Sequence, residues 1–436
     1  DRMPSFAIGD IAVSDDGRTI WVGTGESNSQ RTSYAGTGVY RSEDAGKTWV
    51  FRGLPESHHI GRIVLDPQRP GTVWVAALGH LYSPNPDRGL YKTVNAGVTW
   101  NCVLPGDATT GAVDIQLDPK NPDRAIAAMW DRDRRAWNFR EAGKGSAVML
   151  TENGGRTWTR PAGLPSGADL GRVGLAVTPA DPKRVYAYVD NQGASTEWLN
   201  EDENVAGGRL TPRRFARLTE TVFLQIPEAA LAEFWESNAP KDFKLADAVA
   251  GVKAGTLTLD RIRDRIKERR PELFDAGTTL DEAYRSDDGG RTFRRLARFG
   301  PGGGYYYERA FANPADADDV FLCGVELKRT RDGGKTWRTV GREMHVDFHA
   351  VLFESPGKIW IGNDGGPYLA TGGGEKWRPL NNLSVAQSTT LALDPRNELV
   401  YTGLQDNGTM RGSRRYVPGK SDLADWKVIS GGDGSH

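Results

Sequence analysis

The chain has 436 residues, 38% hydrophobic and 26% charged, a balance typical of folded globular proteins and not of disordered chains. Its 56 basic and 57 acidic residues give a formal net charge of −1, which argues against nucleic acid as a partner, because nucleic-acid-binding proteins carry a basic surface. No apolar stretch approaches the length of a membrane span, and the two cysteines, Cys102 and Cys323, suggest neither a disulfide framework nor a metal motif.

A short corner motif recurs along the chain. Its first copy is SEDAGKTW, Ser42 to Trp49. Later copies are TVNAGVTW from Thr93, TENGGRTW from Thr151, SDDGGRTF from Ser286, TRDGGKTW from Thr330 and the divergent ATGGGEKW ending at Trp377. The Asp or Asn side chain can accept backbone N–H bonds, while glycine adopts positive φ. The motif therefore predicts a tight turn that leads into a strand beginning with a large aromatic residue, which is a structural role.

Two short apolar strands and a variable loop precede most corners, as in GRIVLDPQRPGTVWVAAL from Gly61. Four short strands in each repeat predict an all-β, seven-bladed β-propeller of four-stranded antiparallel blades. Trp426 marks the last fourth strand, and we expect the ring to close blade against blade. The blades are expected at about 8–55, 56–105, 106–165, 166–298, 303–342, 343–382 and 383–431.

Residues 193–282 lack the strand-and-corner pattern of the repeats and carry helical patterns instead. They predict a small helical insertion within blade 4. Thr211 and Pro212 are suited to the N-cap and first position of a helix. Leu259, Ile262 and Ile266 fall on one face of a second helix. We interpret the charged remainder of that helix as a solvated face.

The two ends of such a propeller differ in their loops. Asp-Pro turns and the repeated corners share one rim, whereas irregular loops such as ALGHLYSPNPDRG from Ala77 share the other. Variable loops on a rigid scaffold usually carry binding and catalysis. We therefore expect function on the irregular rim.

The segment MHVDFHA places His345, Asp347 and His349 at alternating positions, so that one strand face carries all three. No cofactor is specified outright, but this pattern makes a divalent metal ion one hypothesis. Residues four apart on a regular strand are roughly 13 Å apart, so a hydrogen-bonded polar cluster is the favoured alternative. Two of these residues with Asp364 or Asp406 would make a more compact ligand set.

Two further kinds of residue are candidates for the site. Glu308, Asp364 and Asp406 are candidate catalytic carboxylates, although no spacing proves a pair. Aromatic and amide side chains could hold a sugar or peptide, although aromatic residues in this fold more often pack between blades. The candidate ligand-binding residues are Trp130, Tyr305, Tyr306, Asn363, Gln405 and Asn407.

The corners, together with RGLYKTVNAGVTW, GNDGG and GLQDNG, resemble the bacterial sortilin-type N-terminal or BNR/Asp-box repeat family, which is described as glycosyl hydrolase-like. The resemblance covers essentially the whole chain except the insertion. It implies an exported protein, extracellular or periplasmic, and further domains beyond the C-terminus. Its motifs specify fold more than activity.

We expect a non-catalytic binding or interaction module that holds a glycan, a peptide or a partner protein at the channel mouth, because a propeller does not imply an enzyme and no complete catalytic set is visible. A glycoside hydrolase acting at the same mouth is the alternative. A structural subunit of a larger assembly is a third.

Overall fold

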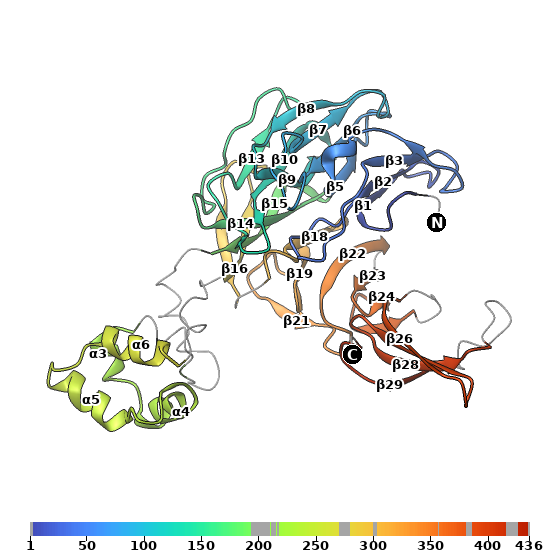
Figure 1. Ribbon diagram of the computed structural model, residues 1–436. Helices are drawn as coiled ribbons and strands as arrows, with labels where there is room; N and C mark the ends of the chain where they lie inside the picture. The colour runs from blue at the N-terminus through green and yellow to red at the C-terminus, as the bar shows by residue number, and fades with distance from the viewer. Residues whose placement is uncertain are drawn as a thin grey trace. The chain divides into compact units, whose positions relative to one another are not determined.

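The computed structural model describes residues 3–192, 210, 215, 218–269, 280–299, 303–355, 357–380, 386–415 and 426–434. The chain divides into two compact units. We call Asp1–Asn191 with Asp281–His436 the sheet unit, and Gln192–Leu280 the helical unit. Figure 1 colours the strands of the sheet unit from blue at β1 to red at β29.

The first three sheets use the chain up to Thr151. Sheet 1 contains β1 (Ile8–Val13), β2 (Ile20–Thr24), β3 (Val39–Ser42) and β4 (Val50–Phe51). After the 3-10 helix η1 (Pro55–Ser57), sheet 2 contains β5 (Ile60–Leu65), β6 (Val73–Ala77), β7 (Gly89–Thr93) and β8 (Asn101–Pro105). Sheet 3 contains β9 (Thr110–Asp118), β10 (Asn121–Asp131) and β13 (Ala147–Thr151), and a small ribbon pairs β11 (Asp133–Arg134) with β12 (Phe139–Arg140).

Four further sheets complete the unit. Sheet 4 contains β14 (Leu170–Thr178), β15 (Asp181–Asn191), β16 (Leu280–Ser286) and β17 (Arg294–Arg298). Sheet 5 contains β18 (Arg309–Asn313), β19 (Asp316–Cys323), β20 (Leu327–Thr330) and β21 (Arg338–Val340). Sheet 6 contains β22 (Phe348–Ser355), β23 (Lys358–Asn363), β24 (Gly366–Thr371) and β25 (Lys376–Pro379). Sheet 7 contains β26 (Ser388–Asp394), β27 (Leu399–Leu404), β28 (Gly408–Ser413) and β29 (Lys427–Ser430).

The predicted four-stranded antiparallel sheets are thus present, with one exception among the described residues. Sheet 3 has three strands, and an isolated antiparallel bridge between Leu150 and Thr159 lies where its fourth strand was expected. The fold of the sheet unit is therefore built almost entirely from hairpin-connected strands.

The repeated corner is a hydrogen-bonded turn. Asp44 accepts bonds from the Thr48 amide at 2.8 Å and the Thr48 hydroxyl at 2.7 Å, while the Ser42 hydroxyl accepts a bond from the Gly46 amide at 2.8 Å. The two bonds from Thr48 hold the pKa of the Asp44 carboxyl well below its usual range. Equivalent contacts recur around Asn95, Asn153, Asp288 and Asp332.

Each corner is also tied to the first turn of its own sheet. The Ala96 amide donates to the Gly71 carbonyl at 2.8 Å, and the Gly333 amide donates to the Asp318 carbonyl at 3.0 Å. These bonds place the corners and the first turns at the same end of the sheets, as predicted. We call this end the corner rim and the opposite end the loop rim.

The corner aromatics join one sheet to the preceding one. The Trp100 ring meets Trp21 edge to face at 6.2 Å between centroids and donates from Nε1 to the Arg52 carbonyl at 2.6 Å. Trp158 repeats the arrangement with Trp74 at 6.4 Å. Each such tryptophan therefore adds both apolar area and a directional bond between neighbouring sheets.

The expected closure of the ring is not present in the described residues. The innermost strands β1, β5, β9, β14, β18 and β22 pack in succession, but β26 does not pack along β1. Leu391 and Leu393 on β26 are 73% and 70% exposed, and Ile11 on β1 is 56% exposed. Apolar side chains that closure would bury thus remain open to solvent.

The helices of the helical unit are drawn in yellow-green in Figure 1, and the unit has its own apolar core. Its described helices are α3 (Glu220–Phe223), α4 (Glu228–Asn238), α5 (Leu245–Lys253) and α6 (Leu259–Lys267). The predicted apolar face of α6 is confirmed, because Leu259, Ile262 and Ile266 are all buried. The predicted helix start at Thr211 and Pro212 lies outside the described residues. Within the part of the chain that is described, no helix is both long and apolar enough to cross a membrane.

Candidate functional site

The long loop between β2 and β3 bridges several sheets at the loop rim. The Ser27 carbonyl accepts a 2.9 Å bond from Arg172 on β14, and the Ser27 hydroxyl accepts a 2.7 Å bond from Arg309 on β18. The Asn28 carbonyl accepts a bond from Arg132, which directly follows β10. Guanidinium groups from sheets 3, 4 and 5 therefore fix a loop that belongs to sheet 1.

The inner strands also carry a buried charge network. Arg62 on β5 donates to Asp114 on β9 at 2.9 Å and lies 3.8 Å from Asp10 on β1. Although burial opposes its charge, these two carboxylates raise the Arg62 pKa above its usual value. Loss of either carboxylate would leave this mostly enclosed cation without full compensation, which is strongly destabilising.

Glu308, a predicted catalytic carboxylate, is completely buried. Burial first, and then the nearby carboxyls of Asp281 and Asp190, raise its pKa well above the usual value, while Arg172 opposes the shift. Burial also raises the pKa of Asp281 to about 6. Because no part of Glu308 reaches solvent, its position does not suit a residue that must touch a substrate.

Trp130, a predicted ligand-binding residue, is also fully buried. Its Nε1 donates to the Glu141 carbonyl at 2.6 Å, and the guanidinium carbons of Arg132 and Arg172 lie 5.1 and 5.4 Å from its ring centroid. The ring is thus part of the core and holds the two arginines by cation–π contacts. It presents no face to a ligand.

The tyrosines before β18 form a half-buried aromatic row. Tyr305 meets Phe139 edge to face at 5.5 Å between centroids, and Tyr306 lies 6.0 Å from Tyr305. Tyr305 and Tyr306 are partly exposed, whereas Tyr307 is buried. Tyr305 and Tyr306 are therefore the partly exposed members of the row, and their role in ligand binding stays a prediction.

His349 lies against two of these tyrosines. Its ring stacks on Tyr307 at 5.6 Å and 15°, and meets Tyr306 edge to face at 5.0 Å. The His349 Nε2 lies 2.9 Å from the Asp364 carboxylate. The Tyr307 hydroxyl donates to Asp347, and burial followed by this bond raises the Tyr307 pKa. Packing and hydrogen bonds thus fix the His349 ring beside a carboxylate.

Loop residues of sheet 7 complete the group. Gln405 Nε2 donates to the carboxylates of Asp406 at 3.0 Å and Asp433 at 2.8 Å. Asn407 Nδ2 donates to the Asp364 carbonyl at 3.1 Å. Burial, and then the nearby Asp364 and Asp433 carboxylates, raise the pKa of Asp406. We call Tyr305, Tyr306, Tyr307, His349, Asp364, Gln405 and Asp406 the tyrosine–histidine site.

Asn363 has a supporting position. It is 9% exposed, and its Nδ2 donates to the His345 carbonyl at 2.7 Å, while its Oδ1 accepts from the Gly365 amide at 3.0 Å. Both ends of its side chain are therefore engaged in holding the loop after β23.

The predicted metal ligands have separate partners. His345 contacts the backbone carbonyls of Val346 and Asp406 through its two ring nitrogens, at 3.1 and 3.0 Å. Asp347 bonds Tyr307, and His349 bonds Asp364. Each of the three therefore has its own hydrogen-bond partner, and they do not form a group of close ligand atoms within the described residues.

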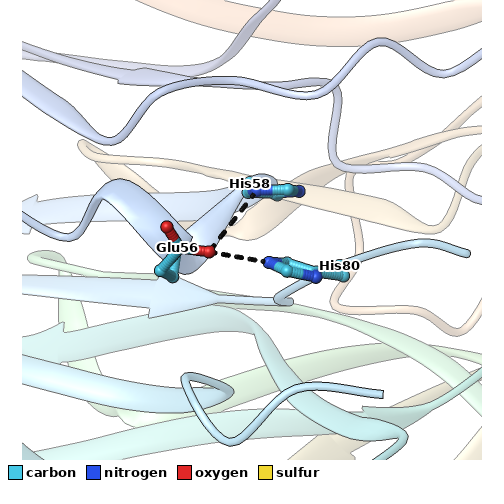
Figure 2. Close-up of side chains that lie close together, drawn as sticks. All are labelled: Glu56, His58 and His80. Carbon is cyan, nitrogen blue, oxygen red and sulfur yellow. Dashed lines mark hydrogen bonds and ion pairs between the residues drawn. The ribbon is translucent and has the colours of Figure 1, made fainter. Parts of the chain in front are cut away.

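A different set meets at one point within the described part of the chain. Figure 2 shows Glu56, His58 and His80, whose ligand atoms all lie within 4.8 Å of one another. Sequence reasoning missed this set, although PESHH and GHL both occur in connections at the loop rim. It also missed the arginines that hold the loop between β2 and β3, which are Arg132, Arg172 and Arg309.

No protein-family model and no curated protein matches the sequence. Among solved structures, the GH74 xyloglucanase from Xanthomonas campestris aligns with a TM-score of 0.54 and 12% identity, over 92% of this chain and 51% of that chain. YCF48 from Cyanidioschyzon merolae aligns with a TM-score of 0.45 and 12% identity, over 94% of this chain and 96% of that chain.

The chain thus spans about half the length of the xyloglucanase. At 12% identity the likeness shows the fold alone, which is that of a β-propeller protein. The resemblance to the sortilin-type or Asp-box family rests on the sequence motifs and stays a prediction.

Proposed function

We propose that the chain is a glycan-binding module whose seven sheets are the blades of a seven-bladed propeller, and that the tyrosine–histidine site holds the ligand. The observation that carries this proposal is the pair of partly exposed tyrosines, Tyr305 and Tyr306, of which Tyr306 lies near the carboxylates of Asp364 and Asp406. Aromatic faces pack against the C–H groups of sugars, while carboxylates and amides bond their hydroxyls. A peptide is the alternative ligand for the same tyrosine–histidine site.

Preorganisation favours ligand binding at this position. Tyr306 and Tyr307 hold the His349 ring from two sides, and Asp364 fixes its Nε2. Gln405 links Asp406 to Asp433. A ligand that meets fixed side chains loses less free energy to ordering than one that meets mobile side chains.

The proposal is tested by screening the intact chain on glycan and peptide arrays and then titrating the strongest hit. Tyr306→Ala removes the ring and should weaken binding at least tenfold. Tyr306→Phe keeps the ring and is the matched control. Equal binding by Tyr306→Ala and the unchanged chain would contradict the site assignment.

A glycoside hydrolase is the second candidate, and one observation favours it. Burial, and then the nearby Asp364 carboxylate, raise the pKa of Asp406, and a carboxyl with a raised pKa beside a second carboxyl suits the general acid of a glycoside hydrolase. Turnover of a glycan that is lost in both Asp364→Asn and Asp406→Asn, with folding intact, would establish this activity over simple binding.

We also propose export to the periplasm or the cell exterior, in line with the family resemblance. Fractionation of cells that express the full-length protein, followed by immunoblotting, tests this. Recovery with the cytoplasmic marker would contradict it.

A further inference from the structure

Glu56, His58 and His80 come from two connections that meet at the loop rim. Glu56 lies within η1, His58 follows η1, and His80 lies in the loop between β6 and β7. The His80 Nε2 lies 3.1 Å from Glu56 Oε2, and the His58 Nε2 lies 3.9 Å from the same oxygen. Figure 2 shows both rings directed at that carboxylate.

The position of the His58 ring is not explained by hydrogen bonding. A separation of 3.9 Å is too long for a hydrogen bond, and within the described residues the ring forms no other. The two imidazoles also stack at 3.7 Å between centroids with planes 21° apart. Two partly buried histidines thus share one carboxylate oxygen, and only one of them bonds it.

The separations suit a bound ion. In a tetrahedral zinc site with bonds of about 2.0–2.1 Å, neighbouring ligand atoms are roughly 3.4 Å apart. The separations of 3.1 and 3.9 Å bracket that value, and all three ligand atoms lie within 4.8 Å of one another. Two imidazoles and a carboxylate are a ligand set that zinc and similar divalent ions accept.

Neighbouring groups hold the ligands in place. The Ser83 hydroxyl lies 2.9 Å from the His80 Nδ1, which leaves Nε2 for the shared position. The buried Asn85 accepts a 2.9 Å bond from the His80 amide and donates a 3.1 Å bond to the Glu56 carbonyl. His58 itself is held at a positive φ of 48°, which a non-glycine residue adopts only where its surroundings impose it.

We propose that Glu56, His58 and His80 form a binding site for a divalent transition-metal ion of the zinc class. Three protein ligands leave a fourth position for water or a ligand atom. The site uses different residues from the tyrosine–histidine site and does not depend on the proposed glycan binding. It adds a second ligand-binding position to the loop rim.

The test is a zinc titration of the intact chain after treatment with a chelator, followed by isothermal calorimetry. The expected result is one zinc ion per chain and a zinc-dependent rise in Tm. Glu56→Gln and His80→Gln should each lower the affinity at least tenfold. Glu43→Gln, which changes an exposed carboxylate at the corner rim, should leave the affinity unchanged.

Folding of each variant is checked by circular dichroism and by its Tm without metal. Glu56 is exposed, so Glu56→Gln should unfold at the same temperature as the unchanged chain when zinc is absent. Failure of the unchanged chain to bind zinc stoichiometrically would overturn the proposal. Equal affinity in His80→Gln would do so as well.

Discussion

Arg172 donates a 2.9 Å hydrogen bond to the backbone carbonyl of Ser27, and the two residues are 145 positions apart in the chain. Arg309 donates to the hydroxyl of the same serine at 2.7 Å. Two arginines from adjacent sheets thus hold one residue of a loop that begins in sheet 1. The loop rim is organised by contacts of this long sequence separation.

Ser27→Ala should destabilise the sheet unit. The change leaves a guanidinium group of Arg309 without its acceptor, and a hydrogen bond to a charged group contributes about 1.5–3 kcal/mol. We expect a fall of several degrees in Tm by calorimetry. Ser14→Ala, which removes a hydroxyl in the first turn of sheet 1 that bonds only groups within five residues, should have a smaller effect. Equal effects would mean that the loop is not held in this way.

Asp288→Asn should reduce the sensitivity of the fold to acid. Partial burial acts to raise the Asp288 pKa, but bonds from Thr292 and Ser286 outweigh it and lower the pKa to about 2. Because the folded pKa lies below the unfolded value near 3.9, this carboxylate stabilises the fold above pH 4, and its contribution is lost as the pH falls towards 2.

Asparagine already occupies the matching position in the corners of Asn95 and Asn153, so the variant should fold. We compare the free energy of unfolding of Asp288→Asn with that of the unchanged chain. Between neutral pH and pH 2–3 this difference should shift in favour of the variant by no more than about 1 kcal/mol, because the group is partly solvent-exposed. Denaturant unfolding across this range measures it, with Asp15→Asn at an exposed turn as the control. An unchanged pH profile in Asp288→Asn would contradict the role of the corner carboxylate.

Glu308→Gln should stabilise the protein increasingly as the pH rises. Burial raises the Glu308 pKa well above its usual value, so the unchanged chain loses stability as the pH rises from the unfolded pKa, near 4.3, towards the folded one. Glutamine cannot ionise and removes this loss. The difference in Tm between variant and unchanged chain should be larger at pH 8 than at pH 5. A difference independent of pH would show that Glu308 does not titrate in this way.

Removal of residues 193–279 should leave the sheet unit folded. The flanking strands β15 and β16 are hydrogen-bonded neighbours, and Asn191 Nδ2 donates to Glu282 at 3.0 Å, so a short glycine–serine linker can join them. The helical unit has a separate core. We expect a Tm close to that of the intact chain. Loss of cooperative unfolding would show that the sheet unit requires the insertion.

Local sequence patterns predicted the local parts of this structure. The bonds of Asp44 with Thr48 follow from side chains four residues apart, and the buried face of α6 follows from its 3.6-residue period. The residues of the tyrosine–histidine site lie near one another because the segments before β18, after β23 and after β27 are all located at the loop rim.

Features that depend on distant contacts could not be predicted. Trp130 and Glu308 are residue types that are common in ligand sites. Both are buried, however, among arginines and carboxyls that include residues of other strands. The meeting of His58 with His80 depends on how two separate connections fold over one another. The prediction that the ring closes was wrong for the described residues. The number of strands does not determine whether β26 packs against β1.

The partly exposed tyrosines at the loop rim are proposed to hold a ligand. The most direct measurement is calorimetric titration of the best array hit into the unchanged chain, Tyr306→Phe and Tyr306→Ala. We expect saturable binding that Tyr306→Phe retains and that Tyr306→Ala weakens at least tenfold, with all three proteins still folded. Binding of the same strength by all three would contradict it.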